Sequence, residues 1–242
     1  MEMKRKNLLF GVLIVGMIAF VVWGLFAGLY HRLNRDAIVV QIDDSRPVVA
    51  LTFDDGPNPR YTPQVLDILY DEQVPATFFL VGEKLSENKL LVQEIALSGH
   101  EIGSHTFSHA DLTTLDTEGI QREIQQTADV LHKILPDYTI EHVRPPYGRY
   151  TPKVQAAIDL PLILWTIDSG DWENPDAERI YTTVVNHIQD GDTIVFHDDN
   201  PQTVAALKKI ITELKTRGYQ FATVSQLCKR QSEESQMAAV RQ

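Results

Sequence analysis

The feature that most constrains the fold is a regular alternation of short apolar segments with longer amphipathic segments, from Val48 onward. The short segments, such as VVALTF (48–53) and ATFFLV (76–81), have the length and composition of buried strands. The longer segments, such as 62–73, carry apolar residues at helical spacing. This alternation over about 180 residues predicts an α/β fold with a parallel sheet, either closed as a barrel or left open.

The full pattern predicts alternating strands and helices in a single domain. Strands are predicted at 48–53, 76–81, 101–105, 142–147, 162–167, 193–198 and 219–224, and helices at 62–73, 88–99, 116–135, 176–188 and 201–218. The sequence shows no internal repeat, and the loop after the first strand matches neither of the glycine-rich nucleotide-binding loops. We therefore expect one α/β domain at 47–228, a polar linker at 36–46 and a polar, disordered tail at 229–242.

Residues 7–30 form an apolar run without a charged side chain. At about 1.5 Å per residue, a helix of this length spans the roughly 30 Å hydrocarbon core of a bilayer. The basic residues at 4–6 favour a cytoplasmic N-terminus. A cleaved signal peptide is the alternative, but the run is longer than a usual signal-peptide core and no clear A-x-A site follows it. We expect 1–35 to form a cytoplasmic stub and a single transmembrane anchor that holds the domain outside the cell membrane.

Overall charge narrows the class of partner. The chain has 22 Lys and Arg against 33 Asp and Glu, a formal net charge of −11. Without a basic stripe to neutralise phosphates, we expect no nucleic-acid partner. The single cysteine, Cys228, excludes an intrachain disulfide.

Polar side chains follow five of the predicted strands at their carboxyl ends. In chain order they are Asp54 and Asp55, His105 and His109, Arg144 and Tyr147, Asp168 and Asp171, and His197 and Asp198. In parallel α/β folds these strand ends meet on one face, where catalytic residues collect. The sequence therefore predicts a single active site built from these residues.

His105 and His109 are the candidate metal ligands among them. A single histidine is usually a hydrogen-bonded structural residue, but two histidines four residues apart after a strand favour a metal site. Two histidines with one carboxylate leave coordination positions open, which is typical of catalytic zinc, and the same ligands suit Fe(II), Co(II) or Mn(II).

The adjacent carboxylates Asp54 and Asp55 supply the matching acid. Asp-Gly and Pro-Asn-Pro form turns, so the segment DDGPNP also shapes a loop. Two carboxylates after a buried strand are costly unless a metal or Arg144 offsets their charge. One carboxylate could bind the metal while the other accepts a proton from water, but the spacing does not say which does which.

The later strands carry a candidate general acid and two candidate ligand contacts. His197 ends an apolar strand, and Asp171 could orient it and balance its charge; a satisfied histidine at a barrel rim is the alternative. Trp172 could line a sugar-binding groove, or pack in the core. The backbone N–H of Tyr147 could stabilise an oxyanion, although a Pro-Pro-Tyr-Gly turn can exist for shape alone.

Taken in order, five segments resemble the five motifs of the NodB-type polysaccharide deacetylases, which are family 4 carbohydrate esterases. The segments are TFDDGP (52–57), SHTFSH (104–109), RPPYG (144–148), DSGDW (168–172) and IVFHD (194–198). The resemblance covers about residues 46–228. It implies a distorted (β/α) barrel and metal-dependent removal of N-acetyl groups from N-acetylglucosamine-type polymers, such as peptidoglycan.

The resemblance also implies a role for each motif residue. Its metal ligands would be Asp55, His105 and His109, holding a divalent ion, Zn²⁺ first and Co²⁺ as an alternative. Its catalytic residues would be Asp54 as base, Arg144 as the partner of Asp54, Tyr147 as backbone oxyanion donor, His197 as general acid and Asp171 as the residue that tunes His197.

One departure from the family pattern concerns the acetyl pocket. The family often has leucine directly before the last motif histidine, where this chain has Phe196. If that side chain shapes the pocket, the larger ring would narrow it.

Two other functions remain open from the sequence. The first is a catalytically inactive polysaccharide-binding module on the same fold. The second is a glycoside hydrolase, which needs two carboxyl groups roughly 5–9.5 Å apart and would leave the two histidines without a role.

Overall fold

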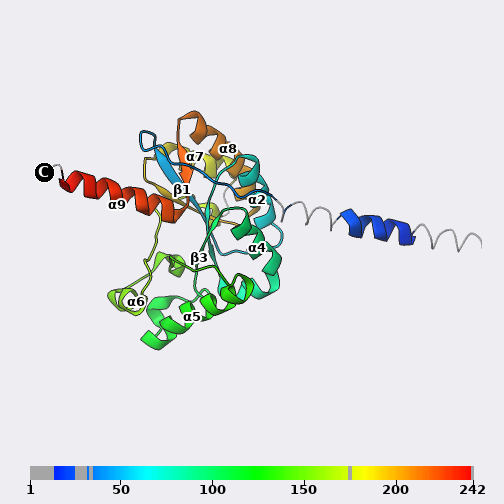
Figure 1. The fold of residues 1–242 in the computed structure, drawn as a ribbon, viewed down its shortest axis with the longest axis horizontal. Coiled ribbons are helices and arrows are strands. Elements are labelled where there is room, and N and C mark those ends of the chain that lie inside the picture. The colour runs from blue at the N-terminus through cyan, green and yellow to red at the C-terminus, as the bar shows by residue number, and fades with distance from the viewer. Residues whose placement is uncertain (1–13, 25–31, 33–34, 174–175, 241–242) are drawn as a thin grey trace, which may run out of the picture. The chain divides into compact units, whose positions relative to one another are not determined.

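The computed structural model describes residues 14–24, 32, 35–173 and 176–240 (Figure 1). The predicted anchor lies only partly within these residues: 14–24 are helical, and the remainder of 7–30 falls outside them. Within the described residues, no helix has both the length and the apolar character needed to cross a membrane.

Six parallel strands form the sheet of the compact unit that begins at Ala37. They are β1 (Val48–Asp54), β2 (Thr77–Leu80), β3 (Glu101–Ser104), β4 (Ile167–Asp168), β5 (Thr193–His197) and β6 (Gln220–Ala222). The order is β3-β2-β1-β5-β4, and β6 pairs with the first half of β1 while β2 pairs with its second half. The predicted parallel α/β fold is therefore confirmed.

Two single bridges extend the strand pairing beyond β3. Ser104 bridges to Val143, and Val143 bridges to Leu162, in the segment that leads to β4. Because β4 pairs with β5, the backbone pairings run round in a ring, as in a distorted barrel. The expected strands at 142–147 and 162–167 are much shorter than predicted, in part because Pro145 and Pro146 have no N–H to donate to a ladder.

The long helices cover the sheet close to their predicted positions. They are α2 (Thr62–Asp71), α4 (Lys89–Leu97), α5 (Thr117–Ile134), α7 (Ala177–His187) and α8 (Pro201–Thr216) (Figure 1). Side chains of Asp116, Asp176 and Asn200 cap α5, α7 and α8 by accepting hydrogen bonds from backbone N–H groups. The short helices α3 (Gly82–Leu85) and α6 (Pro152–Ala157) were not predicted.

Strand β1 is buried on both faces, and its side chains alternate between two environments. Leu51 and Phe53 belong to the large core under the helices, whereas Val48 and Ala50 belong to a separate small cluster. Asp54 lies in register with the second set, so the alternation directs its side chain away from the large helix-covered core.

The segments on either side of the domain differ from the predictions. In the predicted linker 36–46, Ile38 is buried and its N–H donates to the Ser98 carbonyl at 2.9 Å, so this segment packs on the domain. The predicted disorder of 229–242 is wrong for 229–240, because α9 (Val224–Val240) continues through them. Arg230 fastens this helix through a 2.7 Å ion pair with Asp190.

Candidate active site

A cleft of about 800 Å³ opens at the carboxyl ends of the strands. The residues predicted for the site that line it are Asp54, Asp55, His105, His109, Tyr147, Asp168, Trp172 and His197. Arg144 and Asp171 are fully buried and contact these residues from behind. The structure thus brings together the predicted site residues except Phe196 and Asp198, which are buried and do not line the cleft.

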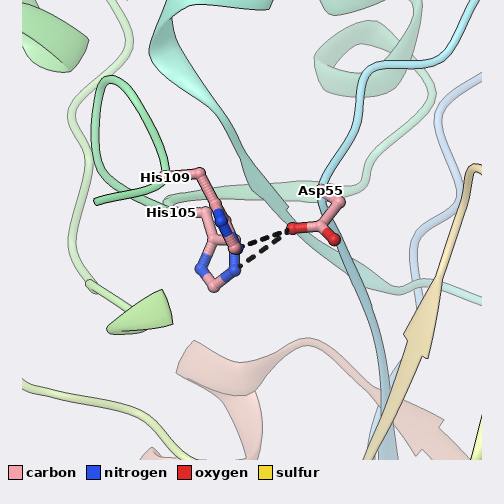
Figure 2. A group of neighbouring side chains, drawn as sticks. All are labelled: Asp55, His105 and His109. Carbon is pink, nitrogen blue, oxygen red and sulfur yellow. Dashed lines mark ion pairs between the residues drawn. The ribbon is translucent and has the colours of Figure 1, made fainter. Parts of the chain in front are cut away.

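The predicted metal ligands form one compact group (Figure 2). Asp55 Oδ1 lies 3.4 Å from His105 Nε2 and 3.1 Å from His109 Nε2. His105 Nδ1 lies 2.8 Å from the Arg144 carbonyl oxygen, which can only accept, so Nδ1 carries a proton and Nε2 is the nitrogen directed at Asp55. Asp55 Oδ1 is buried and has no hydrogen-bond partner among the described residues. A buried carboxylate oxygen without a hydrogen-bond partner, with two histidine nitrogens within 3.4 Å of it, fits a divalent cation.

The charge of Asp55 also suits a cation site. Burial alone would raise the pKa of Asp55, but His105 and His109 outweigh burial and hold this pKa well below its ordinary value. The side chain is therefore a carboxylate across the physiological pH range.

Several of the site residues adopt a strained backbone. Asp55 (φ 71°), His109 (φ 58°) and Tyr147 (φ 61°) are in the left-handed region, as is Thr106 (φ 66°) between the two histidines. Left-handed backbone in a non-glycine residue costs on the order of 1–3 kcal/mol and collects at functional sites. His105 and His109 therefore converge through a left-handed turn rather than along the face of a helix.

Asp54 pairs with a completely buried arginine. Arg144 Nη1 donates to Asp54 Oδ1 at 2.7 Å and to Thr52 Oγ1 at 2.7 Å, and its Nε and Nη2 donate to backbone carbonyls. The guanidinium also lies 4.0 Å from the centre of the Phe79 ring. Asp54 Oδ2 is 3.9 Å from His105 Nε2, so the second carboxylate oxygen faces the metal-ligand group. Asp54 is thus fixed and charge-balanced beside that group, as a base would be.

His197 and Asp171 form a second pair. His197 Nδ1 lies 2.7 Å from Asp171 Oδ1, and the His197 backbone N–H donates to Asp171 Oδ2 at 2.8 Å. The same Oδ2 accepts a hydrogen bond from the Thr203 hydroxyl. Burial opposes protonation of His197, but the hydrogen bond and charge of Asp171, together with the nearby Asp54 and Asp55, raise its pKa to about 9.

The base and the acid come from neighbouring strands. Asp54 on β1 and His197 on β5 are register partners, so their backbones lie side by side. With Nδ1 of His197 engaged by Asp171, the proton that a ligand can receive is the one on Nε2. The arrangement places a charged proton donor next to a carboxylate base.

Tyr147 and Trp172 line the open part of the cleft. No described residue accepts a hydrogen bond from the Tyr147 backbone N–H, which leaves this donor for a ligand. The Tyr147 ring packs edge-on against His109, with 4.9 Å between ring centres. Trp172 is 62% exposed, and its Nε1 donates to Asp168 Oδ1 at 3.2 Å, so an oriented aromatic face is open to a sugar ring.

The prediction that Phe196 shapes the acetyl pocket is wrong. Phe196 is fully buried in the large core and stacks on Phe53, with 5.7 Å between ring centres. Side chains alternate along β5, so Val195 and His197 line the cleft while Phe196 faces the helices. Placing His197 in the site was enough to predict this, because the residue two positions earlier shares its face.

The fold and the site together define a class of protein, namely a parallel α/β protein whose cleft brings two histidines and a carboxylate that could hold a metal ion beside the pairs Asp54–Arg144 and Asp171–His197. Residues 41–164 match the family model described as polysaccharide deacetylase, which spans about half of the chain. The chain belongs to the polysaccharide deacetylase family, and the resemblance seen in its motifs is confirmed.

Individual relatives support the same assignment. The peptidoglycan-N-acetylglucosamine deacetylase of Bacillus cereus is 38% identical over 195 residues, which cover 77% of this chain and 91% of the relative. The structure of peptidoglycan deacetylase PdaC from Bacillus subtilis matches with a TM-score of 0.79 at 35% identity, over 83% of this chain and 98% of that chain. A family 4 acetyl xylan esterase from Clostridium thermocellum, solved with a cobalt ion, matches with a TM-score of 0.71 at 35% identity, over 74% of this chain and 89% of that chain.

Proposed function

We propose that this protein removes N-acetyl groups from N-acetylglucosamine-type residues of a cell-envelope polysaccharide such as peptidoglycan, and releases acetate. The observation that carries the proposal is the placement of two ion pairs, Asp54–Arg144 and Asp171–His197, beside one metal-ligand group, with Asp54 and His197 on neighbouring strands. The names of the Bacillus relatives support peptidoglycan as the substrate.

The group formed by Asp55, His105 and His109 fits a divalent metal, because the buried Asp55 Oδ1 lacks any hydrogen-bond partner among the described residues. We propose Zn²⁺, with Co²⁺ as the alternative; the cobalt ion bound by the xylan esterase supports a divalent ion in this fold. When bound, the ion would supply Lewis-acid polarisation of the acetamide carbonyl and activation of water.

The residues of the chain supply the proton transfers. Asp54, held by Arg144, accepts a proton from the attacking water. The Tyr147 backbone N–H donates a hydrogen bond to the carbonyl oxygen as negative charge develops there. His197 then gives its Nε2 proton to the leaving amine, while Asp171 balances the charge of the imidazolium. Water and the acetamide thus give acetate and a free amine.

We further propose that residues 1–35 form a single-pass anchor that holds the catalytic domain outside the cytoplasm. The uncharged run at 7–30 and the basic residues before it support this placement. Cell fractionation tests it: the chain should stay in the membrane fraction after a high-salt wash, and external protease should digest its domain. Recovery of a shortened chain in the medium would instead indicate a cleaved signal peptide.

Acetate release by the purified full chain tests the activity. Peptidoglycan and N-acetylglucosamine oligomers are the substrates, assayed as purified, after chelation, and after Zn²⁺ or Co²⁺ is added back. We expect chelation to abolish release and metal to restore it, and Asp54→Asn to lose about 10²–10⁴-fold in kcat. Polymer binding without acetate release would favour an inactive binding module. Chelator-resistant formation of reducing ends would favour a glycoside hydrolase.

A further inference from the structure

Asp198, the residue directly after His197, is a completely buried carboxyl outside the cleft lining. Its Oδ2 accepts a hydrogen bond from the Thr62 hydroxyl, whereas its Oδ1 is buried without a partner among the described residues. Burial raises the pKa of this carboxyl to about 7. Burying a carboxyl oxygen without a hydrogen-bond partner costs free energy, so the burial of Asp198 needs a structural reason.

The side chain of Asp198 packs against the loop that carries the base and one metal ligand. A Cβ added at Gly56 would lie 2.5 Å from Asp198 Oδ1 and 2.7 Å from its Cγ, so the loop backbone touches the carboxyl directly. The Asp198 N–H also donates a long hydrogen bond, 3.4 Å, to the Asp54 carbonyl.

The hydroxyl of Thr62 connects Asp198 to the far end of the same loop. Thr62 Oγ1 accepts a hydrogen bond from the Asn58 N–H at 2.8 Å while it donates to Asp198. The N-cap position of α2 is Tyr61, so the Thr62 hydroxyl at the first helical position is available for this connection. Asp198 therefore contacts the loop at three places between Asp54 and Thr62.

We propose that Asp198 is a positioning residue that clamps the loop 54–62 against the end of β5, and thereby sets Asp54 and Asp55 relative to His197. The inference rests on the proposed function, because it concerns the same site. It assigns Asp198 no contact with substrate.

Asp55 explains why the loop needs a clamp. Its backbone is left-handed, with φ 71°, a conformation that the surrounding structure must impose. On one side, Lys84 Nζ donates to the Asp55 carbonyl at 2.7 Å and the Val81 N–H donates to the Gly56 carbonyl at 2.9 Å. Asp198 contacts the same loop from the β5 side. Removing its carboxyl would take away this contact and leave those from Lys84 and Val81.

Zn²⁺ affinity is the first measurement, because it reports ligand placement independently of turnover. The full chain is stripped of metal and titrated with Zn²⁺ against a Zn²⁺-binding dye, and kcat and KM for acetate release are measured on the reloaded protein. The variants are Thr62→Val, which lacks the hydroxyl, Thr62→Ser, which keeps it, Asp198→Ala and Asp198→Asn. Thr77→Val is the matched control. Thr77 is buried to the same extent as Thr62, but it lies at the amino end of β2, whereas the cleft lies at the carboxyl ends of the strands.

We expect Thr62→Val and Asp198→Ala to lower Zn²⁺ affinity and kcat by about 10–100-fold each, with KM within about twofold. Thr62→Ser and Asp198→Asn should recover most of both, because each keeps the hydrogen bond. Wild-type Zn²⁺ affinity in Thr62→Val and Asp198→Ala would overturn the proposal, as would an equal loss in Thr77→Val. If Asp198→Ala does not fold, the two Thr62 variants decide the question alone.

A double-mutant cycle tests the contact with Gly56. Gly56→Ala should lower Zn²⁺ affinity in the wild-type background, and should lower it much less in the Asp198→Ala background, where the space is free. Additive losses would refute the direct contact.

The two proposals fail in distinguishable ways. A wild-type chain that binds Zn²⁺ but releases no acetate would overturn the proposed function, while the comparison of affinities would still decide the role of Asp198.

Discussion

Replacing Arg144 by methionine should destabilise the protein severely, because the substitution leaves Asp54 buried without its counter-charge. Arg144 is fully buried, and its guanidinium hydrogen-bonds to Asp54, to Thr52 and to two backbone carbonyls. Removing one partner of a buried ion pair costs about 3–5 kcal/mol. Against a total of about 5–15 kcal/mol for a typical domain, this is a large share of the free energy of unfolding.

Thermal unfolding of the metal-free full chain, followed by circular dichroism, measures the effect. At about 2–4 °C per kcal/mol for a domain of this size, Tm should fall by roughly 6–20 °C in Arg144→Met. Removing both charges in Arg144→Met/Asp54→Leu should cost less than the sum of the two single substitutions, because no unpaired charge remains. A Tm within about 2 °C of wild type for Arg144→Met, or additive losses in the double variant, would refute this reasoning.

Three further predictions address other parts of the site and the core. In the metal-free protein, the pKa of His197 is raised to about 9, so its protonated form stabilises the fold fully below pH 6.5, and this stabilisation is lost as pH rises through 9. Urea unfolding should show the free energy of unfolding of wild type falling over this range, with a flatter pH profile in Asp171→Asn. Identical profiles would contradict the prediction. Phe196→Leu should lower Tm and leave KM for acetylated oligomers unchanged, whereas Val195→Phe should raise KM or lower kcat because Val195 lines the cleft; the reverse pattern would return Phe196 to the pocket. Burial lowers the pKa of His100 to about 3, so the free energy of unfolding of wild type should decrease as pH falls from 6.5 toward 3. Between pH 7 and pH 4.5, urea unfolding should show a smaller decrease for His100→Asn than for wild type. Equal decreases would assign the acid sensitivity to other groups.

The two ion pairs to which we assign catalytic roles could be predicted from the sequence because strands place Asp54 and His197. Asp54 and His197 each end an apolar run, and the carboxyl ends of parallel strands meet on one face whatever their loops do. Their ion-pair partners also follow paired segments: Arg144 comes directly after the bridge residue Val143, and Asp171 lies three residues after β4, so the charge balance of the site could be inferred from the sequence.

The pocket lining was harder to predict, since β5 is apolar on both faces. When each side of a strand is buried, composition does not show which side chains face the site. Because side chains alternate along a strand, placing His197 in the cleft also places Val195 there and directs Phe196 to the opposite face. The strand predicted at 142–147 is too long for another reason. The segment is apolar enough to resemble a strand, but Pro145 and Pro146 lack the N–H groups that would continue the ladder beyond the bridge at Val143.

The placement of the metal ligands was beyond sequence reasoning, because loops rather than strands determine it. Asp55 and His109 reach their positions through left-handed backbone, an uncommon conformation that the four-residue spacing of the histidines does not reveal. The residues that contact such a loop are distant in sequence, as Lys84 and Asp198 illustrate for the loop around Asp55. The strands therefore fix the positions of Asp54 and His197, whereas the positions of the proposed metal ligands depend on contacts that hold strained loops. Substitutions at such contacts should affect metal affinity before they affect the fold.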